Sequence, residues 1–364
     1  METPSSDRAQ PFAGPALLIV VKFLSRGSRQ GTPEVWLRQF PGLNPVWGQC
    51  RFVFDPEERR YDWLVAYDDL PKETDTRFAK GREELACPRG HTLLITTEPS
   101  SIKRYGRFAR QFGHVLTSHE ANALRHPHAI RAQPALHWFY GYDYQHNRVL
   151  PFDELRDHPP LAKSELLSIV TSSKQQRHTL HRRRYQFTGE LKARLPELAV
   201  FGHGVRDMDD KAEALATFRY HVAVENYAGP HHWTEKLADA FLGCTLPFYF
   251  GCPNARDYFP EGSFIPIDIF DPPGAARIIR AAIDSGEYEK RLPLILEARR
   301  RVLYEYNTFA VLSRLIEERH SPAAMTPGVT LLSRHALRAA SPLNLLADLV
   351  EKARGRWAAF RRAR

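Results

Sequence analysis

The sequence is poor in cysteine and has no long apolar run, and each shortage narrows the class of protein. Its 364 residues include four cysteines, none with the CxxC or zinc-site spacing: Cys50, Cys87, Cys244 and Cys252. They are too few for the disulfide framework of a secreted domain. The early apolar run, residues 16–21, is too short to span a bilayer, and no signal-peptide pattern precedes it. We therefore expect reduced thiols in a cytoplasmic protein.

Acidic residues do not gather in an evident metal site. The pairs Asp68-Asp69 and Asp209-Asp210 do not have the Asp-x-Asp arrangement that holds a divalent ion on a nucleotide sugar. Basic side chains can neutralise a diphosphate without a cation. The sequence therefore predicts no metal ligands and no obligatory metal or other cofactor.

The overall charge is positive, and the composition is that of an ordinary globular protein. The net charge is +9, with 43% hydrophobic and 26% charged residues. Such a charge favours an anionic partner: nucleotide phosphates, an acidic membrane surface or nucleic acid. No nucleic-acid-binding module is evident and much of the charge lies in the last 25 residues, so we expect no nucleic acid partner.

Short apolar runs alternate with polar or helical stretches along most of the chain, which predicts an α/β protein. Predicted strands cover residues 16–24, 62–69, 92–97, 114–118, 166–170, 197–201, 220–224, 246–250 and 264–269. Predicted helices begin near residue 32 and cover 178–195, 211–218, 233–244, 273–284 and most of 288–319. We expect a disordered N-terminus over 1–15, α/β domains over 16–160 and 161–325, and a tail over 326–364.

One stretch, residues 218–251, has the pattern strand, loop, helix, strand. In such a unit, functional groups gather at the carboxyl end of the first strand and at the start of the helix. The polar residues at those two places are Glu225, Asn226, Thr234, Glu235 and Lys236.

Lys236 stands in the first turn of the predicted helix, where a cation opposes the positive end of the helix dipole. The placement is understandable if an anion binds there, held by the free backbone N–H groups and the ammonium together. A phosphate suits this description. The alternative is that Lys236 points to solvent and Glu235 merely complements the dipole.

The motif E-N-x7-T-E-K, followed by an apolar helix and a strand ending P-x-x-x-G, resembles the donor-binding signature of glycosyltransferase family 10. This family contains the α-1,3/1,4-fucosyltransferases, which use GDP-fucose. The resemblance implies the two-domain GT-B fold, built of two Rossmann-like domains, with the donor site in the C-terminal one. Tyr227 departs from the family's serine, and His232-Trp233 depart from its Tyr-Val.

The resemblance also implies a catalytic base and a phosphate ligand. Glu98, just past a predicted strand, resembles the family's Gly-Glu element, with Thr97 in place of glycine. A carboxylate there can take the proton of an attacking hydroxyl; the alternative is that it caps a helix starting near Ser101. Arg184, in the frame set by Phe187, resembles the arginine of the family's Ser-Asn…Arg-x-x-Phe element, and the alternative is a solvated basic face.

The remaining donor-site expectations also come from the resemblance. Glu235 is expected to accept hydrogen bonds from the ribose hydroxyls, and Asn226 to lie beside the nucleotide. Glu225 either contacts the transferred sugar or the diphosphate, or bonds backbone amides at the strand end. His232 is expected to donate a hydrogen bond to phosphate, and Thr234 belongs to the same site.

The C-terminal tail combines an apolar stripe with arginines and aromatics at helical spacing, which suits an anionic membrane surface. The alternatives are a solubilising tail or a helix packed on the core. The resemblance to family 10 implies a bacterial-type fucosyltransferase that acts on a surface glycan, and we expect it to be cytoplasmic or peripheral on the inner membrane face. The rival hypotheses are use of another GDP-sugar, a degenerate scaffold that has lost catalysis, and a nucleic-acid-binding protein.

Overall fold

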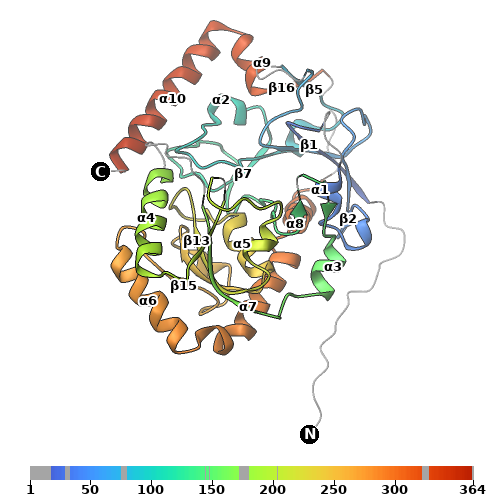
Figure 1. Cartoon of the computed structure of the whole chain (residues 1–364). Coiled ribbons are helices and arrows are strands. Elements are labelled where there is room, and N and C mark those ends of the chain that lie inside the picture. Colours follow the sequence, from blue (N-terminus) through green and yellow to red (C-terminus); the bar gives the residue numbers. More distant parts are fainter. Residues whose placement is uncertain are drawn as a thin grey trace.

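The protein has two lobes, each built on its own β-sheet (Figure 1). The computed structural model describes residues 18–28, 33–74, 80–143, 145–146, 148–171, 180–202, 204–321 and 328–362. The predicted disordered segment 1–15 and the Ser172-Ser173 pair expected to match the family's Ser-Asn lie outside the described residues.

The first sheet has seven strands in the order β2-β3-β1-β4-β6-β7-β8, parallel except for the β2–β3 pair. Its strands are β1 (Ile19–Ser25), β2 (Val46–Trp47), β3 (Cys50–Val53), β4 (Trp63–Tyr67), β6 (Thr92–Ile95), β7 (His114–Thr117) and β8 (Ala129–Arg131). Every residue of β4 and β6 is buried, as expected of central parallel strands covered on both faces. The strands predicted from apolar runs in this half are confirmed.

Helices in the first lobe are short. They are α1 (Glu34–Leu37), α2 (Gly106–Ala109) and the single turns η1 (Pro41–Leu43) and η2 (Arg89–His91). The longer α8 (Thr308–Glu317) returns from the far end of the chain and packs on this sheet through Phe309, Leu312 and Ile316. α8 therefore belongs to the core of the first lobe, although it lies within the range 161–325 assigned above to the second domain.

The second sheet is parallel throughout, in the order β12-β11-β13-β14-β15. Its strands are β11 (Glu165–Val170), β12 (Ala199–Phe201), β13 (Phe218–Val224), β14 (Leu246–Phe250) and β15 (Ile265–Pro266). Its helices are α4 (His181–Arg194), α5 (Glu235–Leu242), α6 (Pro272–Asp284) and α7 (Glu287–Tyr304). Strand–helix alternation in this lobe agrees with the predicted α/β class.

The predicted helix over 211–218 is wrong. Only the 3₁₀ turn η3 (Lys211–Ala214) forms, closed by a capping box between Asp210 and Glu213. The chain leaves helical geometry at Leu215, and Phe218 already belongs to β13, where it pairs with Glu165 of β11. Strand pairing therefore overrides local helix preference here.

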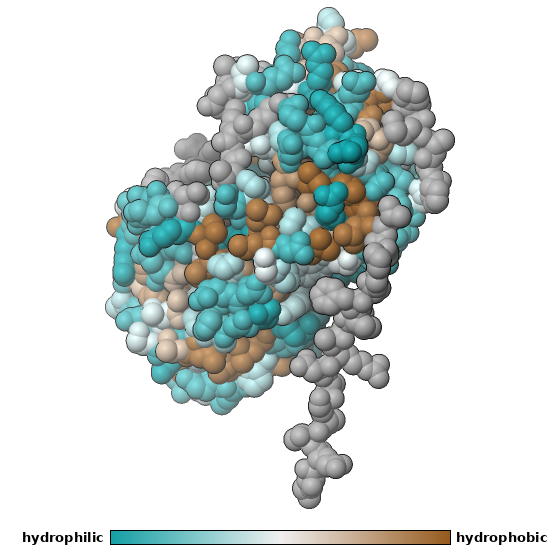
Figure 2. Space-filling view, turned by 90° about the vertical axis from the view of Figure 1, so that its right-hand side faces the viewer, coloured by the Kyte–Doolittle hydropathy of each residue, from teal (hydrophilic) through white to brown (hydrophobic). Residues whose placement is uncertain are grey.

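The connection between the lobes holds the small hairpin β9 (Tyr142–Asp143) and β10 (Arg148–Val149), followed by α3 (Phe152–Asp157). A second small pair joins β5 (Arg82–Glu84) to β16 (Thr330–Leu332). On the face at the right of Figure 1, apolar side chains gather around the middle, between more hydrophilic surfaces above and below (Figure 2).

The tail forms α9 (Arg334–Ala339) and α10 (Pro342–Arg362), which lie beside α2 on the first lobe (Figure 1). Arg107 donates to Asn344 at 2.6 Å, and Arg338 pairs with Asp348 at 2.8 Å. The exposed apolar side chains of α10 include Leu343, Leu345, Leu346, Leu349 and Val350. Contact with an anionic membrane stays a prediction. Among the described residues, no helix has both the length and the apolar character needed to cross a bilayer.

Candidate active site

The cleft between the lobes consists of two adjoining pockets. One, of about 200 Å³, lies over the second sheet. The other, of about 310 Å³, opens between the two sheets. They share three lining residues, Asn226, Glu235 and Lys236. A combined site of this kind has the size of ordinary small-molecule sites, roughly 300–1,000 Å³.

The topology of the second sheet explains the position of the first pocket. Chain order and spatial order reverse between β11 and β13, and ligands of open α/β sheets bind at the carboxyl ends of strands at such a switch point. Thr171 follows β11, Asn226 follows β13, and both line the pocket. Asn226 therefore lines a pocket at the strand end predicted from the sequence, and its function stays a prediction.

A buried carboxylate, Glu225, organises the turn from β13 into α5. Its side chain is 0% exposed and accepts hydrogen bonds from the backbone N–H of Thr234 at 2.8 Å and from its hydroxyl at 2.7 Å. A Cβ added at Gly251 would lie 2.3 Å from Glu225 Cγ, so the final glycine of the motif is needed beside this side chain. The geometry favours the alternative in which Glu225 bonds backbone amides. Thr234 in turn is the N-cap of α5.

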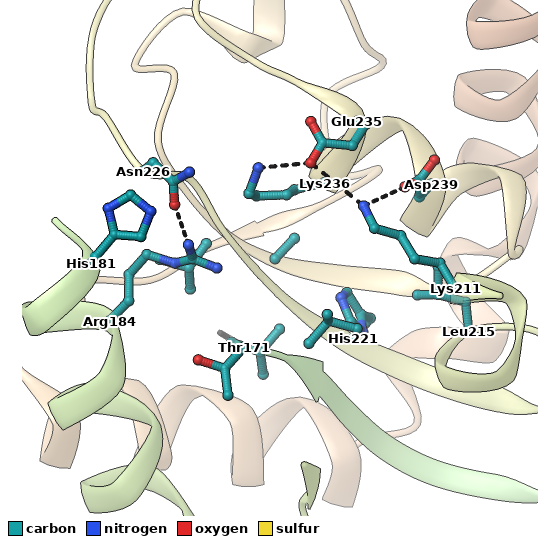
Figure 3. A pocket seen from close by; sticks show the side chains of 14 residues that line it. Thr171, His181, Arg184, Lys211, Leu215, His221, Asn226, Glu235, Lys236 and Asp239 are labelled. Atoms are coloured by element: carbon teal, nitrogen blue, oxygen red, sulfur yellow. Dashed lines mark hydrogen bonds and ion pairs between the residues drawn. The ribbon is translucent and has the colours of Figure 1, made fainter. Parts of the chain in front are cut away.

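Lys236 and Glu235 stand in the first turn of α5 and face the cleft (Figure 3). The Lys236 ammonium lies 2.8 Å from Glu235 Oε1 and 3.7 Å from Glu225 Oε2. Burial alone would raise the pKa of the Glu235 carboxyl, but the ammonium groups of Lys236 and Lys211 outweigh it and hold that pKa far below its usual range. Glu235 is therefore an ionised acceptor at neutral pH.

Arg184 comes to the same pocket from the first turns of α4 (Figure 3). The guanidinium is 8% exposed and donates to Asn226 Oδ1. Its buried Nε has no partner among the described residues, and burial lowers the pKa of the group. A buried cation with an unpaired donor at an open pocket is suited to an anionic ligand. A solvated basic face does not describe this residue.

Glu98 follows β6 and lines the opposite wall of the cleft. Its side chain is reached by solvent, and its carboxylate has no hydrogen bond or ion pair within the described residues. Desolvation by the walls of the cleft and the nearby charge of Asp68 raise the pKa of the Glu98 carboxyl, against the opposing effect of the charges of Lys103 and Lys236. The helix expected near Ser101 does not form; the chain makes a turn there, and α2 begins at Gly106.

A polar network holds the backbone that carries Glu98. Asp68, at the end of β4 with φ of 73°, accepts from the Tyr105 hydroxyl at 2.5 Å, from the Thr97 hydroxyl at 2.9 Å and from Lys103. Tyr105 also accepts the backbone N–H of Thr97 at 3.1 Å. Thr97, the departure from the family's glycine, thus contributes a bond that glycine would not make.

The loop between β13 and α5, residues 225–234, is called the donor loop. Two of its departures from the family motif, Tyr227 and His232, form hydrogen bonds with the segment after β7. His232 Nδ1 lies 3.0 Å from the Ser118 hydroxyl, and the Tyr227 hydroxyl donates to Glu120. His232 is 2% exposed, and burial lowers its pKa to about 3, so the ring is neutral. Donation from His232 to a phosphate stays a prediction. These contacts join the donor loop to the first lobe.

Several residues of the site were not foreseen from the sequence. Lys211 and Asp239 line the first pocket, and Ser118 and Glu120 hold the donor loop. Their partners lie far away in the sequence, and no motif marked them. In the aromatic segment 138–142, Trp138 and Tyr140 are core residues, 2% and 4% exposed, whereas Phe139 and Tyr142 are only partly buried.

Three of the four acidic residues considered for metal binding, Asp68, Asp69 and Asp210, accept hydrogen bonds from protein donors. Asp68 is held as described above, and Asp210 Oδ1 accepts from the backbone N–H of Ala212 and Gly141. The sequence also contains one Asp-x-Asp triplet, residues 207–209, which lies on a largely exposed segment and lines neither pocket. Within the described ranges, no three His, Cys, Asp or Glu residues are placed to hold a metal. Metal independence stays a prediction.

Because four buried histidines are neutral in the folded protein, we expect the stability of the protein to fall at acidic pH. Burial lowers the pKa of His119 and His137 to about 4 and that of His221 and His232 to about 3. The unfolded chain, with pKa values near 6.5, binds more protons below that pH, so stability falls as the pH decreases from about 6.5 toward 4. At pH 5 each histidine would cost roughly 2 kcal/mol.

Thermal unfolding between pH 7 and pH 5 measures this loss. His221→Asn is expected to reduce the pH dependence of Tm, whereas the exposed His158→Asn is not. A Tm that stays constant over this range would contradict the prediction.

A pocket in one lobe, lined by the basic residues Arg184, Lys211 and Lys236, faces the Glu98 carboxylate of the other lobe. Comparison with known proteins specifies the class. Residues 161–286 match the family model described as "Glycosyltransferase family 10 (fucosyltransferase) C-term". This part of the chain therefore belongs to glycosyltransferase family 10, and the resemblance inferred from the motif is confirmed.

Individual relatives are similar to this chain either over a short segment or at low sequence identity. A 72-residue segment, 20% of this chain, is 33% identical to the alpha-(1,3)-fucosyltransferase FucT of Helicobacter pylori and spans 14% of that relative's length. A crystal structure of an alpha1,3-fucosyltransferase aligns with 88% of this chain and 95% of its own, with 16% identity and a TM-score of 0.48. A crystal structure of an alpha1,3-fucosyltransferase with GDP-fucose aligns with 87% of this chain and 95% of its own, with 14% identity and a TM-score of 0.46.

Proposed function

We propose that this protein transfers fucose from GDP-fucose to a hydroxyl of a glycan, such as a bacterial surface polysaccharide or lipopolysaccharide, with inversion at the anomeric carbon. One observation carries the proposal: Arg184, Glu235 and Lys236 converge on the switch point of the family 10 domain, while Glu98 faces them across the cleft. Two parallel sheets with the cleft between them correspond to a GT-B arrangement.

The chemistry needs a base on one side and positive charge on the other. As the acceptor oxygen attacks the anomeric carbon, Glu98 takes its proton and the bond from that carbon to the diphosphate oxygen breaks. GDP leaves with its growing charge stabilised by Arg184, Lys236 and the backbone N–H groups at the start of α5. Glu235 accepts hydrogen bonds from the ribose hydroxyls, and Asn226 lies beside Arg184.

A titration of the protein with GDP in the presence of a chelator, followed by a GDP-release assay with GDP-fucose, tests the proposal. We expect GDP binding without added metal and slow release even with water as acceptor. Absence of both GDP binding and GDP-fucose turnover with any glycan would refute it. Faster release from another GDP-sugar would instead reassign the transferred sugar.

A further inference from the structure

Lys211 is a largely enclosed ammonium group in the pocket that holds Arg184 and Lys236 (Figure 3). It begins η3, and its side chain is 21% exposed. The ammonium lies 2.8 Å from Asp239 Oδ2 and 3.5 Å from Glu235 Oε1, and it sits 4.9 Å from the centre of the Phe139 ring. Lys211 is thus committed to two carboxylates.

Asp239 fixes Lys211 from the second turn of α5. Its carboxylate is 1% exposed, and Oδ1 accepts the backbone N–H groups of Phe139 at 2.8 Å and Tyr140 at 2.9 Å. Phe139 and its neighbour His137 line the pocket between the two sheets. Through Asp239, the segment of the chain between the two lobes is hydrogen-bonded to α5, on the donor side of the cleft.

Glu235 lies between two cations that approach the same oxygen, Oε1, from different elements. Lys236 is its chain neighbour on α5, whereas Lys211 comes from η3, on the far side of the pocket in Figure 3. A carboxylate has about four acceptor sites, so two ion pairs at one oxygen orient it and leave sites for hydroxyl donors. Without Lys211, the Glu235 carboxylate would be held, among the described residues, by its chain neighbours Thr234 and Lys236 alone.

We propose that Lys211 is a positioning residue, which holds the Glu235 carboxylate ready for the two hydroxyls of a nucleotide ribose while Asp239 keeps the ammonium in place. The inference rests on the proposed function, in which Glu235 binds the ribose. It differs from a phosphate-binding role, because Lys211 acts through Glu235 and not on the diphosphate.

The test compares GDP with 2′,3′-dideoxy-GDP, which lacks both hydroxyls, by calorimetry. We expect the wild-type protein to bind GDP roughly tenfold or more tightly than the dideoxy ligand, since each hydroxyl bonds a charged acceptor. Lys211→Met is expected to bring this ratio close to one while dideoxy-GDP affinity changes little. A general loss of stability would weaken both ligands alike.

Lys163→Met is the matched control. Lys163 is also a partly buried lysine of the second lobe, but its ammonium bonds the backbone carbonyls of Leu215, Ala216 and Gly243, and Lys163 itself does not line the pocket. It should keep the wild-type ligand ratio. If Lys211→Met does not fold because Asp239 is left unpaired, the double variant Lys211→Met/Asp239→Asn removes the pair together and carries the same test.

The outcomes separate the two hypotheses. Wild-type protein that binds no GDP refutes the proposed function itself. Wild-type protein that binds both ligands equally, or a Lys211→Met or double variant that keeps the wild-type ratio, overturns the positioning role and leaves the proposed donor site standing. Loss of the ratio in the Lys211 variants with its retention in Lys163→Met supports the inference.

Discussion

Replacing Glu98 with glutamine is expected to reduce GDP-fucose turnover by roughly 10²–10⁴-fold, the usual contribution of a general base, while GDP affinity stays within about twofold. Glutamine keeps the shape of the side chain but cannot take a proton. Because the Glu98 carboxylate has no bond to lose within the described residues and lies across the cleft from Arg184, the donor pocket should remain intact. GDP release under saturating donor measures the rate, and calorimetry measures the affinity.

The pH profile provides an independent reading of the same residue. Only the deprotonated carboxylate can act as a base, and desolvation by the walls of the cleft together with the charge of Asp68 raises the pKa of Glu98 above its ordinary value. Turnover should therefore fall as the pH decreases through that raised pKa, at a higher pH than for an ordinary glutamate. In Glu98→Gln this acid limb should disappear from the residual rate.

Glu84→Gln serves as the control, because Glu84 is an exposed glutamate of β5 and lines neither pocket. Its turnover and pH profile should match the wild type. A Glu98→Gln enzyme that retains more than about a tenth of the wild-type rate would exclude Glu98 as the base and direct attention to other groups of the cleft.

The local features of this fold were accessible from the sequence. Strand β13, the loop after it and helix α5 were predicted from periodicity, and the strand end that carries Asn226 follows from the same pattern. Glu98 was placed past a strand because an apolar run stops immediately before it. Such signals are contained in about ten neighbouring residues, so a single sequence is enough to detect them.

The features that depend on distant partners were not accessible. Asp239 receives the N–H groups of Phe139 and Tyr140, about a hundred positions away, and Tyr227 reaches Glu120 across the cleft. The apolar face of α8 indicated burial but not which sheet would cover it. Such contacts are determined by tertiary packing, and a single sequence has no local pattern that indicates them.

The departures from the family motif illustrate the same limit. Tyr227 and His232 are two positions at which the sequence departs from a motif that is defined by what it binds. In the structure both side chains also contact the first lobe, at Glu120 and Ser118. A substitution inside a binding motif can therefore alter how the two lobes are held together, a consequence that the motif itself does not reveal.

Replacing Arg184 with methionine is expected to weaken GDP binding by roughly 100-fold, about 3 kcal/mol, because hydrogen bonds to charged groups contribute about 1.5–3 kcal/mol each and a guanidinium can form two with a diphosphate. Methionine fills the space of the aliphatic stem but offers no donor. Guanosine, which has no phosphates, should bind wild type and variant equally, so the ligand pair isolates the diphosphate contribution.

Arg183→Met is the matched control from the same turn of α4. Arg183 donates to the carbonyl of Ile269 at 2.9 Å and lies over the Phe270 ring, away from the pocket that Arg184 enters. It should bind GDP as the wild type does. If Arg184→Met kept wild-type GDP affinity, or lost guanosine to the same degree as GDP, the buried guanidinium would be structural and Lys236 with the start of α5 would have to hold the diphosphate alone.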